Sequence, residues 1–417
     1  MSHSSGFDKV CVVGLGYIGL PTAAMFASRQ VKVIGVDVNQ QVVDTVNRGE
    51  IHIVEPDLDI VVRATVTDGW LRATSKPEPA DAFLVAVPTP FKGEDHVPDL
   101  SYIESACHAI APVLKSGDLV VLESTSPVGA TEAMAGWLAA ARPDLTFPQD
   151  TGDKSDIRVA HCPERVLPGR VMMELITNDR IVGGITPTCG AVAANLYRCF
   201  VTGNCHLSDV RTAELAKLAE NSFRDVNIAY ANELSLICDR LAVDVWELIR
   251  LSNRHPRVDI LQPGPGVGGH CIAVDPWFVI ASAPRESRLI KTARTVNDQK
   301  PEWVIGKINE ALGSSVFQDI DEDLVVALYG LSFKANVDDL RESPALSIAA
   351  SIARVHGELT WFVEPHIEKL PEVLEKGKLV SLESAAAAHV HVLLVDHAEF
   401  RDAKPLSGII VDTRGLW

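Results

Sequence analysis

The chain has 417 residues, of which 47% are hydrophobic and 22% charged, so it is long enough for two or three domains and has the composition of a folded protein. Its formal net charge of -17 at pH 7 excludes the broad basic face that binding to nucleic acid or to an anionic membrane would need. A small anionic ligand is still possible, provided that a local basic pocket holds it.

The first residues lead directly into an apolar strand without the basic and apolar regions of a signal peptide. The longest apolar runs have the length of strands, far short of the ~20 residues that span a bilayer. We therefore expect a cytoplasmic protein. The eight cysteines include no CxxC pair, which favours reduced thiols, and His and Cys are too scattered to suggest a metal site.

Short β-branched runs alternate with helical stretches in the first half of the chain. Strands are expected at 10–13, 31–36, 82–87, 119–122 and 159–162. Strands separated by ten or more helical residues imply right-handed βαβ units and a mostly parallel sheet. The pattern predicts a Rossmann-type doubly wound domain over residues 1–205.

A glycine-rich turn follows the first expected strand. Gly14, Gly16 and Gly19 permit a tight turn and a close approach of backbone N–H groups to a pyrophosphate at the positive end of the next helix. Asp37 ends the second strand about 20 residues later, where an acid accepts hydrogen bonds from ribose hydroxyls. Residues 38–41 contain no Arg or Lys for a 2′-phosphate, so NAD is favoured over NADP. The alternative is a glycine turn that serves only helix packing.

Two later loops, 87–90 and 124–131, follow strands at their carboxyl ends, where open sheets bind ligands. Thr89 and Thr131 are expected cofactor contacts on these loops. The full set expected to contact the cofactor is Gly14, Gly16, Tyr17, Ile18, Gly19, Asp37, Thr89 and Thr131.

The middle of the chain, residues 206–313, is expected to form a helical spine with helices over 211–253 and 287–312. On the first helix, Lys217, Asn221 and Arg224 fall within an arc of about 60°, and the pattern predicts a core face on the other side. That core face would carry Leu215, Leu218, Ala219, Val226 and Ala229. The three polar side chains either face water or clamp an anionic or hydroxylated ligand, and the helix pattern leaves both readings open.

Cys271 ends a loop rich in Pro and Gly, 262–271, and Asp275 follows four residues later. A cysteine is more often inert packing, but a glycine loop that allows close approach of a ligand favours a nucleophile. An aldehyde has no second hydride to give until a nucleophile adds to its carbonyl. A cysteine forms a thiohemiacetal, loses a hydride to NAD and becomes a thioester, so NAD with a loop cysteine indicates four-electron oxidation.

Strands return at 324–328, 359–363, 390–395 and 409–411, which predicts a second α/β domain over residues 314–417. The expected fold class is therefore α/β. A Rossmann-type N-terminal domain, a central helical spine and a Rossmann-like C-terminal domain follow one another along the chain.

These features together resemble the UDP-glucose/GDP-mannose dehydrogenase family over essentially the whole chain. The matching motifs and positions include the glycine turn, 87–90, Ser124-Thr125, Pro163-Glu164, Lys217, Asn221, the loop Gly268-Gly269-His270-Cys271 and Phe333-Lys334. Three further stretches, 161–169, 220–227 and 253–257, resemble the branch of the family that acts on UDP-N-acetyl-D-mannosamine.

The resemblance implies oxidation of the C6 alcohol of a UDP-sugar to a carboxylate. Cys271 would be the nucleophile, Lys217 the acid/base and electrostatic partner of the C6 oxygen, and Glu164 and Thr125 would manage water for thioester hydrolysis. Asn221 and Asp275 would orient water and substrate. The implied substrate contacts are Arg165, Val166, Lys217, Asn221, Arg224, His255, Arg257, Gly268, Phe333, Lys334 and Arg341.

The resemblance also implies a homodimer or higher homo-oligomer formed through the helical spine, with Arg257 entering the neighbour's site, and a role in surface polysaccharide synthesis. The segment between Arg257 and Cys271, which follows His255, is shorter by about two residues than in many glucose-type relatives, a departure from the family pattern at this place.

Three alternatives stand beside this reading. A sister enzyme would act on UDP-glucose, UDP-N-acetylglucosamine or GDP-mannose with the same mechanism. A single-step hydroxyacid dehydrogenase would need no cysteine at position 271 and would yield one NADH per turnover. A catalytically silent nucleotide-sugar sensor would lack the intact Lys217, Cys271 and Asp275.

Overall fold

The computed structural model describes residues 6–93, 95–167, 169–269, 271–318 and 323–417. It divides into two compact units: residues 1–219 with 277–282, and residues 220–276 with 283–417. The long helix α9 (Val210–Leu241) begins in the first unit and continues in the second. The expected division into three domains stays a prediction.

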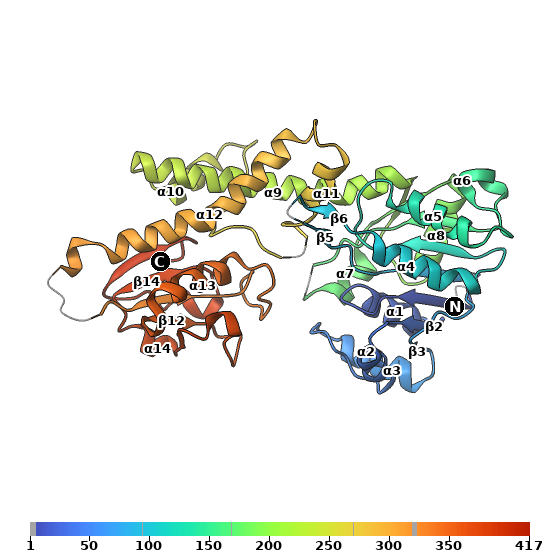
Figure 1. Ribbon diagram of the computed structural model, residues 1–417, viewed down its shortest axis with the longest axis horizontal. Helices are drawn as coiled ribbons and strands as arrows, with labels where there is room; N and C mark the ends of the chain where they lie inside the picture. The colour runs from blue at the N-terminus through green and yellow to red at the C-terminus, as the bar shows by residue number, and fades with distance from the viewer. Residues whose placement is uncertain (1–5, 94, 168, 270, 319–322) are drawn as a thin grey trace. The chain divides into compact units, whose positions relative to one another are not determined.

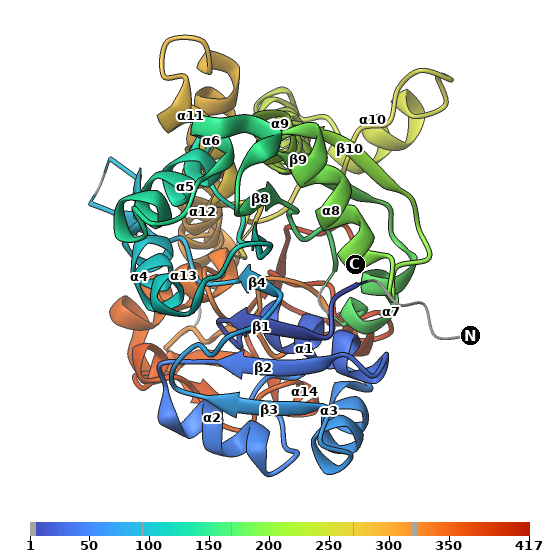
Figure 2. The same ribbon diagram turned by 90° about the vertical axis from the view of Figure 1, so that its right-hand side faces the viewer.

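The first unit is built on an eight-stranded sheet in the order β10-β9-β8-β7-β4-β1-β2-β3 (Figures 1 and 2). All neighbouring pairs are parallel except β8 and β9. The strands are β1 (Lys9–Val13), β2 (Lys32–Val36), β3 (Leu71–Thr74), β4 (Ala82–Val85), β7 (Leu119–Leu122), β8 (Arg158–His161), β9 (Arg180–Gly184) and β10 (Cys205–Asp209). A separate antiparallel pair joins β5 (Phe91–Lys92) to β6 (Val97–Pro98). The doubly wound prediction is confirmed.

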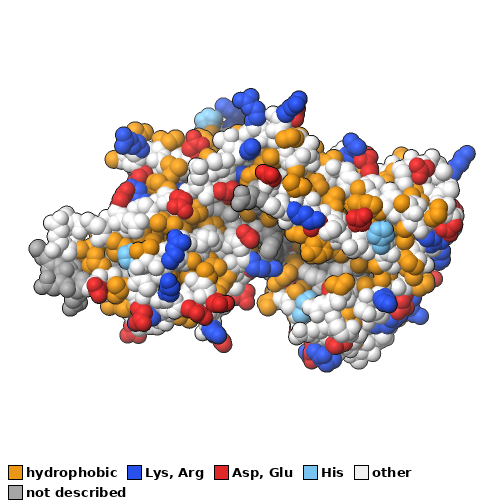
Figure 3. All heavy atoms as spheres, in the orientation of Figure 1, with side chains coloured by type: hydrophobic (Ala, Val, Ile, Leu, Met, Phe, Trp, Pro, Cys, Tyr) orange, Lys and Arg blue, Asp and Glu red, His pale blue; other side chains and the backbone are white. Residues whose placement is uncertain are grey.

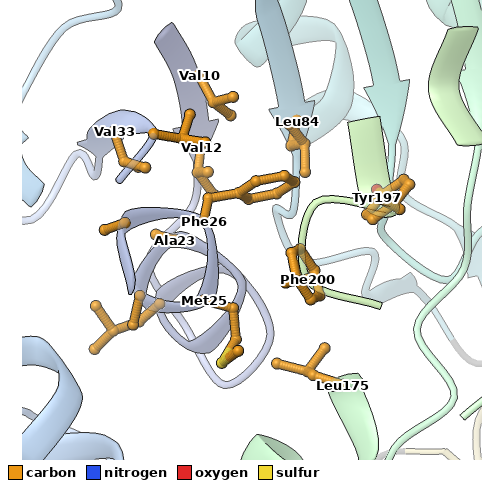
Figure 4. Packing of buried hydrophobic residues seen from close by; sticks show 14 of the residues in the cluster. Val10, Val12, Ala23, Met25, Phe26, Val33, Leu84, Leu175, Tyr197 and Phe200 are labelled. Atoms are coloured by element: carbon orange, nitrogen blue, oxygen red, sulfur yellow. The ribbon is translucent and has the colours of Figure 1, made fainter. Parts of the chain in front are cut away.

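Alternating side chains of β1 face two different hydrophobic clusters, as the period of two in a strand requires. Val10 and Val12 pack with α1 (Gly19–Ser28), whereas Cys11 and Val13 pack with α4 (Ser101–Ile110) and α5 (Ala130–Ala141). Figure 4 shows the first cluster, where Phe26 of α1 lies beside Tyr197 and Phe200. The remaining helices of this unit are α2 (Gln40–Asn47), α3 (Leu58–Thr67), α6 (Pro148–Thr151), α7 (Val171–Thr177) and α8 (Pro187–Tyr197).

The second unit holds a five-stranded, fully parallel sheet in the order β13-β12-β11-β14-β15. Its strands are β11 (Val326–Tyr329), β12 (Thr360–Val363), β13 (Lys378–Leu379), β14 (Val390–Leu393) and β15 (Ile409–Asp412). Helix α13 (Pro344–His356) and part of α12 (Arg288–Leu312) cover one face, and α14 (Leu382–Ala385) lies on the other. The C-terminal Rossmann-like domain is confirmed.

The helical stretch expected over 211–253 is two helices, α9 and α10 (Val245–Ser252). The prediction of one helix was wrong because Ala242 adopts a left-handed conformation with φ 54°, which no glycine or proline announces in the sequence. In the described part of the chain, no helix is both long and apolar enough to span a bilayer. The face drawn in Figure 3 carries basic and acidic side chains side by side.

Candidate functional site

The glycine turn between β1 and α1 is shaped by two contacts that only glycine allows. A Cβ on Gly19 would lie 1.8 Å from the Gly14 carbonyl oxygen, and a Cβ on Gly14, whose φ is 95°, would lie 2.5 Å from the Ala86 carbonyl oxygen. Gly16 differs, since a Cβ there would meet nothing within 4 Å. Helix α1 has no side-chain cap at Ile18, so no side chain covers its first turn, although Leu20 N already donates to the Gly16 carbonyl oxygen at 3.1 Å. This open, positive helix end fits a pyrophosphate.

Asp37 follows β2 and reaches back to the same turn. Its Oδ2 accepts a hydrogen bond from Leu15 N at 3.0 Å, and its Oδ1 accepts one from Asn39 N at 2.9 Å. Each carboxylate oxygen keeps a further lone pair for a ribose hydroxyl. A 2′-phosphate would meet this negative charge, so the residues fit NAD better than NADP.

Thr89 and Thr131, the two threonines expected at the cofactor, differ in their surroundings. The Thr89 hydroxyl is buried and has no hydrogen-bond partner among the described residues. Thr131 donates from its N–H (2.8 Å) and its hydroxyl (2.6 Å) to Glu214 of α9, which also accepts from Gly129 N at 2.7 Å. Burial raises the pKa of Glu214, and these hydrogen bonds oppose the rise. Sequence reasoning missed Glu214, and a cofactor contact of Thr131 stays a prediction.

Glu164 lies on the loop that leaves β8 and is almost fully buried. Its Oε2 accepts from the Arg180 guanidinium at 3.2 Å, and its Oε1 accepts from Arg165 N at 2.6 Å. The Arg165 guanidinium donates to the Asp179 carbonyl oxygen at 3.0 Å and lines an open hollow of about 440 Å³. Val166 packs against the core, and Thr125 is half-buried on the loop after β7. Pro168 lies outside the described residues.

The polar stripe on α9 is not a simple solvent face. Lys217 is only 8% exposed, Asn221 is half-buried and Arg224 is exposed. The predicted core face was partly wrong, because Leu215 is 44% exposed and Ala219 is also exposed, whereas Leu218 and Ala229 are buried. The buried residues Leu218, Ser222, Asp225, Ala229 and Asn232 recur at spacings of four and three, so α9 keeps one buried face, which is rotated from the predicted one toward Lys217. The burial of Lys217 removes the reading in which it only faces water.

Cys271, Asp275 and Asn221 are brought together in the second unit. The Cys271 carbonyl accepts from Val274 N (3.1 Å) and Asp275 N (2.8 Å), a turn that starts α11 (Asp275–Ser282). The buried Asp275 accepts from Asn221 Nδ2 at 2.5 Å through Oδ2. Cys271 is exposed, in contrast to Cys11 and Cys107, whose pKa burial raises to about 12. An accessible thiol one turn before a buried, hydrogen-bonded carboxylate can serve as a nucleophile.

The glycine loop before Cys271 packs against the loop that carries Phe333. A Cβ on Gly268 would lie 2.3 Å from the Glu342 carbonyl oxygen, and a Cβ on Gly269 would lie 3.0 Å from the Phe333 ring. Lys334 is exposed, and Arg341 is exposed and donates to both oxygens of Asp339, at 2.9 and 2.6 Å. The structure therefore brings Gly268 and Phe333 together. His270 lies outside the described residues.

His255 and Arg257 occupy an exposed loop after α10. Asn253 closes this loop by donating to the Ile260 carbonyl oxygen (2.9 Å) and accepting from Ile260 N (2.8 Å). Arg257 N donates to His255 Nδ1 at 3.4 Å, and no described contact joins either residue to another predicted site residue. Their substrate roles stay predictions.

The comparisons with known proteins match these features. Three models of the UDP-glucose/GDP-mannose dehydrogenase family match the chain: the NAD binding domain over residues 8–201, the central domain over 211–299 and the UDP binding domain over 327–417. The chain is 61% identical to the UDP-N-acetyl-D-mannosamine dehydrogenase of Salmonella typhi, with 99% of each chain covered. It is also 61% identical to the NDP-N-acetyl-D-galactosaminuronic acid dehydrogenase of Ralstonia nicotianae, covering 99% of this chain and 96% of that one.

Among solved structures, the UDP-D-ManNAc dehydrogenase of Pyrococcus horikoshii matches with a TM-score of 0.86 and 38% identity, over 98% of this chain and 96% of that one. The match of the NAD binding domain includes the whole glycine turn and Asp37. The fit of these residues to a dinucleotide and the matched domain agree on NAD as the cofactor.

Proposed function

The chain belongs to the UDP-glucose/GDP-mannose dehydrogenase family, and from this premise we propose that it oxidises UDP-N-acetyl-D-mannosamine at C6 to the uronate. The observation that carries the proposal is the 61% identity to a UDP-N-acetyl-D-mannosamine dehydrogenase over nearly the full length of both chains. The accessible Cys271 next to Asp275 and Asn221 supports the four-electron form of the reaction.

We assign the chemistry to residues of this chain as follows. NAD would supply the hydride acceptor, one NAD for each of the two oxidations, so NADH must be exchanged for NAD between them. Lys217 stabilises negative charge on the C6 oxygen, and Asn221 with Asp275 orients substrate and water. The Cys271 thiolate adds to the aldehyde carbonyl, and the thiohemiacetal loses the second hydride to become a thioester. Water then adds to the thioester, the C–S bond breaks, and Glu164 with Thr125 manages the proton that water gives up.

The diphosphate of the substrate needs charge-assisted donors in an otherwise acidic protein. Lys334, Arg224 and Arg257 are exposed cations on the segments implied in substrate binding, and Arg341 lies on the loop of Phe333. We assign the N-acetyl group to Arg165 and Arg224. The product would serve surface polysaccharide synthesis in the cytoplasm, which rests on the resemblance alone.

The yield of NADH from limiting substrate tests this proposal. Purified protein with excess NAD and UDP-N-acetyl-D-mannosamine should give two NADH per sugar and the uronate with little free aldehyde. Cys271→Ala should stop acid formation, while Cys238→Ala, which changes a buried cysteine, serves as the matched control. A ratio near one NADH per sugar would contradict the four-electron mechanism.

A nucleotide of N-acetyl-D-galactosamine is a second candidate substrate, because the relative named NDP-N-acetyl-D-galactosaminuronic acid dehydrogenase is equally identical to this chain. A panel of UDP-N-acetyl-D-mannosamine, UDP-N-acetyl-D-galactosamine, UDP-N-acetylglucosamine, UDP-glucose and GDP-mannose separates the candidates by kcat/KM. A clear preference for a sugar other than the mannosamine would replace the proposed substrate and keep the reaction.

A homodimer is also part of the proposal. Apolar side chains line one side of α9 at spacings of seven and four residues: Phe223 is 72% exposed, Tyr230 55%, Ile237 44% and Leu241 65%. An exposed apolar stripe of this kind is typical of a helix that packs against another copy. Phe223→Asp with Tyr230→Glu should shift the sedimenting species to the monomer, and Val355→Asp, at an exposed apolar residue of α13, should not.

A further inference from the structure

A buried polar network lies beneath the two loops that carry Thr125 and Glu164. Glu123 directly follows β7, Glu164 lies on the loop after β8, Arg180 begins β9 and Tyr197 ends α8. Glu123 is 1% exposed, Arg180 4% and Tyr197 0%. Charged groups are rarely buried this deeply unless their position matters to the protein.

Arg180 is the hub of this network. One nitrogen of its guanidinium donates to Glu164 Oε2 at 3.2 Å, and another donates to Cys162 Sγ at 3.8 Å. The plane lies over the Tyr197 ring at 4.7 Å and over the Phe200 ring at 5.6 Å from the centroids. Figure 4 shows these two rings packed beside α1, so the stack that supports Arg180 is part of the core.

The same stack reaches the neighbouring loop, because the Tyr197 hydroxyl donates to Glu123 Oε1 at 2.9 Å. Glu123 immediately precedes Ser124 and Thr125, so the network fixes the roots of both loops. The other end of the 124–131 loop is held independently by Glu214.

The network holds two carboxyl groups and one guanidinium away from water, and Arg180 can neutralise only one of them. Burial raises the pKa of Glu123 to about 7; Arg180 opposes this rise and Glu164 adds to it. Glu164 makes the direct ion pair with Arg180. Of the two carboxyl groups, Glu164 is therefore the one that Arg180 pairs with and orients.

We propose that Arg180 is a positioning residue for the hydrolytic half of the reaction, holding the Glu164 carboxylate oriented at the carboxyl end of β8. This inference rests on the proposed function. Glu164 Oε1 is fixed by Arg165 N and Oε2 by Arg180, and each oxygen keeps a lone pair that can accept from water. When water attacks the thioester, one of its protons passes to this carboxylate, the C–S bond breaks and Cys271 leaves as a thiolate, so that acid and free cysteine are formed.

Without Arg180, a buried carboxylate loses its counter-ion and the geometry that aims it. The two hydride transfers do not use Glu164 in this scheme, so they should continue until the thioester accumulates. A purely structural ion pair predicts a different result, namely a less stable protein whose folded fraction turns over normally.

Arg180→Gln and Arg180→Lys test the inference, with Arg158→Gln as the control. Arg158 lies on β8 of the same sheet, but its guanidinium donates to Ser155 and not to a glutamate. We expect Arg180→Gln to give a first burst of two NADH per subunit, followed by a steady-state kcat at least about tenfold lower, with the KM for the UDP-sugar within about twofold. Intact-mass spectrometry should find the acyl adduct on Cys271, and Arg180→Lys should recover part of the rate.

If Arg180→Gln does not fold, Arg180→Lys alone should show a smaller fall in kcat and a detectable adduct. An active wild-type enzyme together with Arg180 variants that lose only melting temperature, without an adduct, would overturn the positioning role and leave the proposed function intact. A wild-type protein that oxidises no nucleotide sugar would overturn the proposed function and this inference with it.

Discussion

The five strands of the second sheet follow the same order as five consecutive strands of the first sheet. The two sheets differ in the loop that follows their first strand. In the first unit the order is β3-β2-β1-β4-β7, and in the second it is β13-β12-β11-β14-β15, each with its first strand between the second and the fourth. Open parallel sheets of this order bind ligands at the carboxyl end of the first strand. The same topology therefore offers the same place for a ligand in both units.

What differs is the connection to the next helix. Residues 14–18 join β1 to α1, whose first turn has no side-chain cap. Residues 330–343 join β11 to α13, whose first turn is capped by Ser343, which accepts from Leu346 N at 3.2 Å. A bare helix end offers backbone N–H groups to phosphate, whereas a capped helix leaves recognition to the long loop with Phe333 and Lys334.

The long loop is held by side chains from two other strands. Glu364, after β12, accepts from Leu331 N (2.7 Å) and Ser332 N (3.3 Å), and His397, after β14, accepts from Asn336 N (2.9 Å) at Nδ1. Because Nδ1 accepts, the ring hydrogen sits on Nε2, which donates to Glu364 at 3.1 Å. His366 lies close enough to complete a set of metal-ligand types, but both nitrogens of His397 already serve hydrogen bonds. Fold topology fixes where a ligand can bind, and the loop chemistry decides which.

The largest expected effect comes from breaking the short connection. Gly19→Ala places a Cβ against the Gly14 carbonyl, so we expect a loss of about 3 kcal/mol or more in unfolding free energy. Gly16→Ala meets no atom within 4 Å and should stay within about 0.5 kcal/mol of wild type, yet weaken NAD binding by occupying the open approach. Denaturant melts and NAD titrations on both variants check this. Equal stability of the two would contradict the division of roles among the glycines.

The second-largest expected effect concerns the choice between NAD and NADP. Asp37→Ala removes the acceptor for the ribose and for Leu15 N, so NAD should bind about tenfold more weakly, the size of one hydrogen bond to a charged group. The preference for NAD over NADP should narrow. Asp44→Ala, on the exposed side of α2, is the matched control. Equal use of NAD and NADP by the wild-type protein would show that Asp37 does not select the cofactor.

The sequence analysis predicted the glycine turn between β1 and α1. It did not predict the side chains that hold the long loop between β11 and α13. The strand, turn and helix around Gly14 are local, so 10–13 predicted Lys9–Val13 almost residue by residue. The strands that it missed in the two large sheets, β3, β9, β10 and β13, lie at or near sheet edges and carry exposed residues or glycines in place of a continuous apolar run. Edge positions relax the pattern that identifies buried strands.

In the candidate site, too, the residues that the sequence analysis missed are those that depend on partners far along the chain. Asn221 and Asp275, two of the expected site residues, form a hydrogen bond, but Glu214, Arg180 and Glu364 were not singled out. Each acts by pairing with a residue far along the chain, such as Glu214 with Thr131, and a lone acid or arginine in a helix or strand gives no sign of its partner. Burial of such groups is a property of the tertiary structure and not of local sequence.

A moderate effect should follow from loosening the long loop. Glu364→Gln weakens the hold on Leu331 and Ser332, so we expect the KM for the UDP-sugar to rise about fivefold while NAD binding is unchanged, with a stability loss of about 1–2 kcal/mol. Lys334→Ala should raise the same KM without the stability loss, because this side chain is exposed. An unchanged KM in both variants would argue against this loop as the UDP-sugar contact.

The environment of Glu364 also predicts how the stability of the fold depends on pH. Burial alone would raise the pKa of Glu364, but the hydrogen bonds from His397 and Leu331 N outweigh it and hold the pKa below its ordinary value. For a lowered carboxyl pKa the unfolded chain binds the proton more readily, so the stabilisation is present above the ordinary value and is lost as the pH falls through the folded value. Acid unfolding of the wild type below about pH 4.5 should therefore be steeper than that of Glu364→Gln.

The smallest expected effect concerns the cap that separates the two helix ends. The Ser343 hydroxyl accepts from Leu346 N and donates to the Leu331 carbonyl oxygen at 2.7 Å, so it joins the start of α13 to the root of the long loop. Ser343→Ala removes both bonds and should cost about 1 kcal/mol, the usual value of an N-cap.

If the cap serves only the helix, the KM for the UDP-sugar should stay within about twofold of wild type. If it also sets the loop, the KM should rise together with that of Glu364→Gln, and the double variant should show less than the sum of the two effects, since coupled residues are not additive. Ser381→Ala, at the exposed cap of α14, removes a comparable hydrogen bond away from the loop. It should leave the KM for the UDP-sugar unchanged. Additive effects of Ser343→Ala and Glu364→Gln on the KM would show that the capped helix and the anchored loop act independently, and the contrast between the two sheets would then rest on the length of the loop alone.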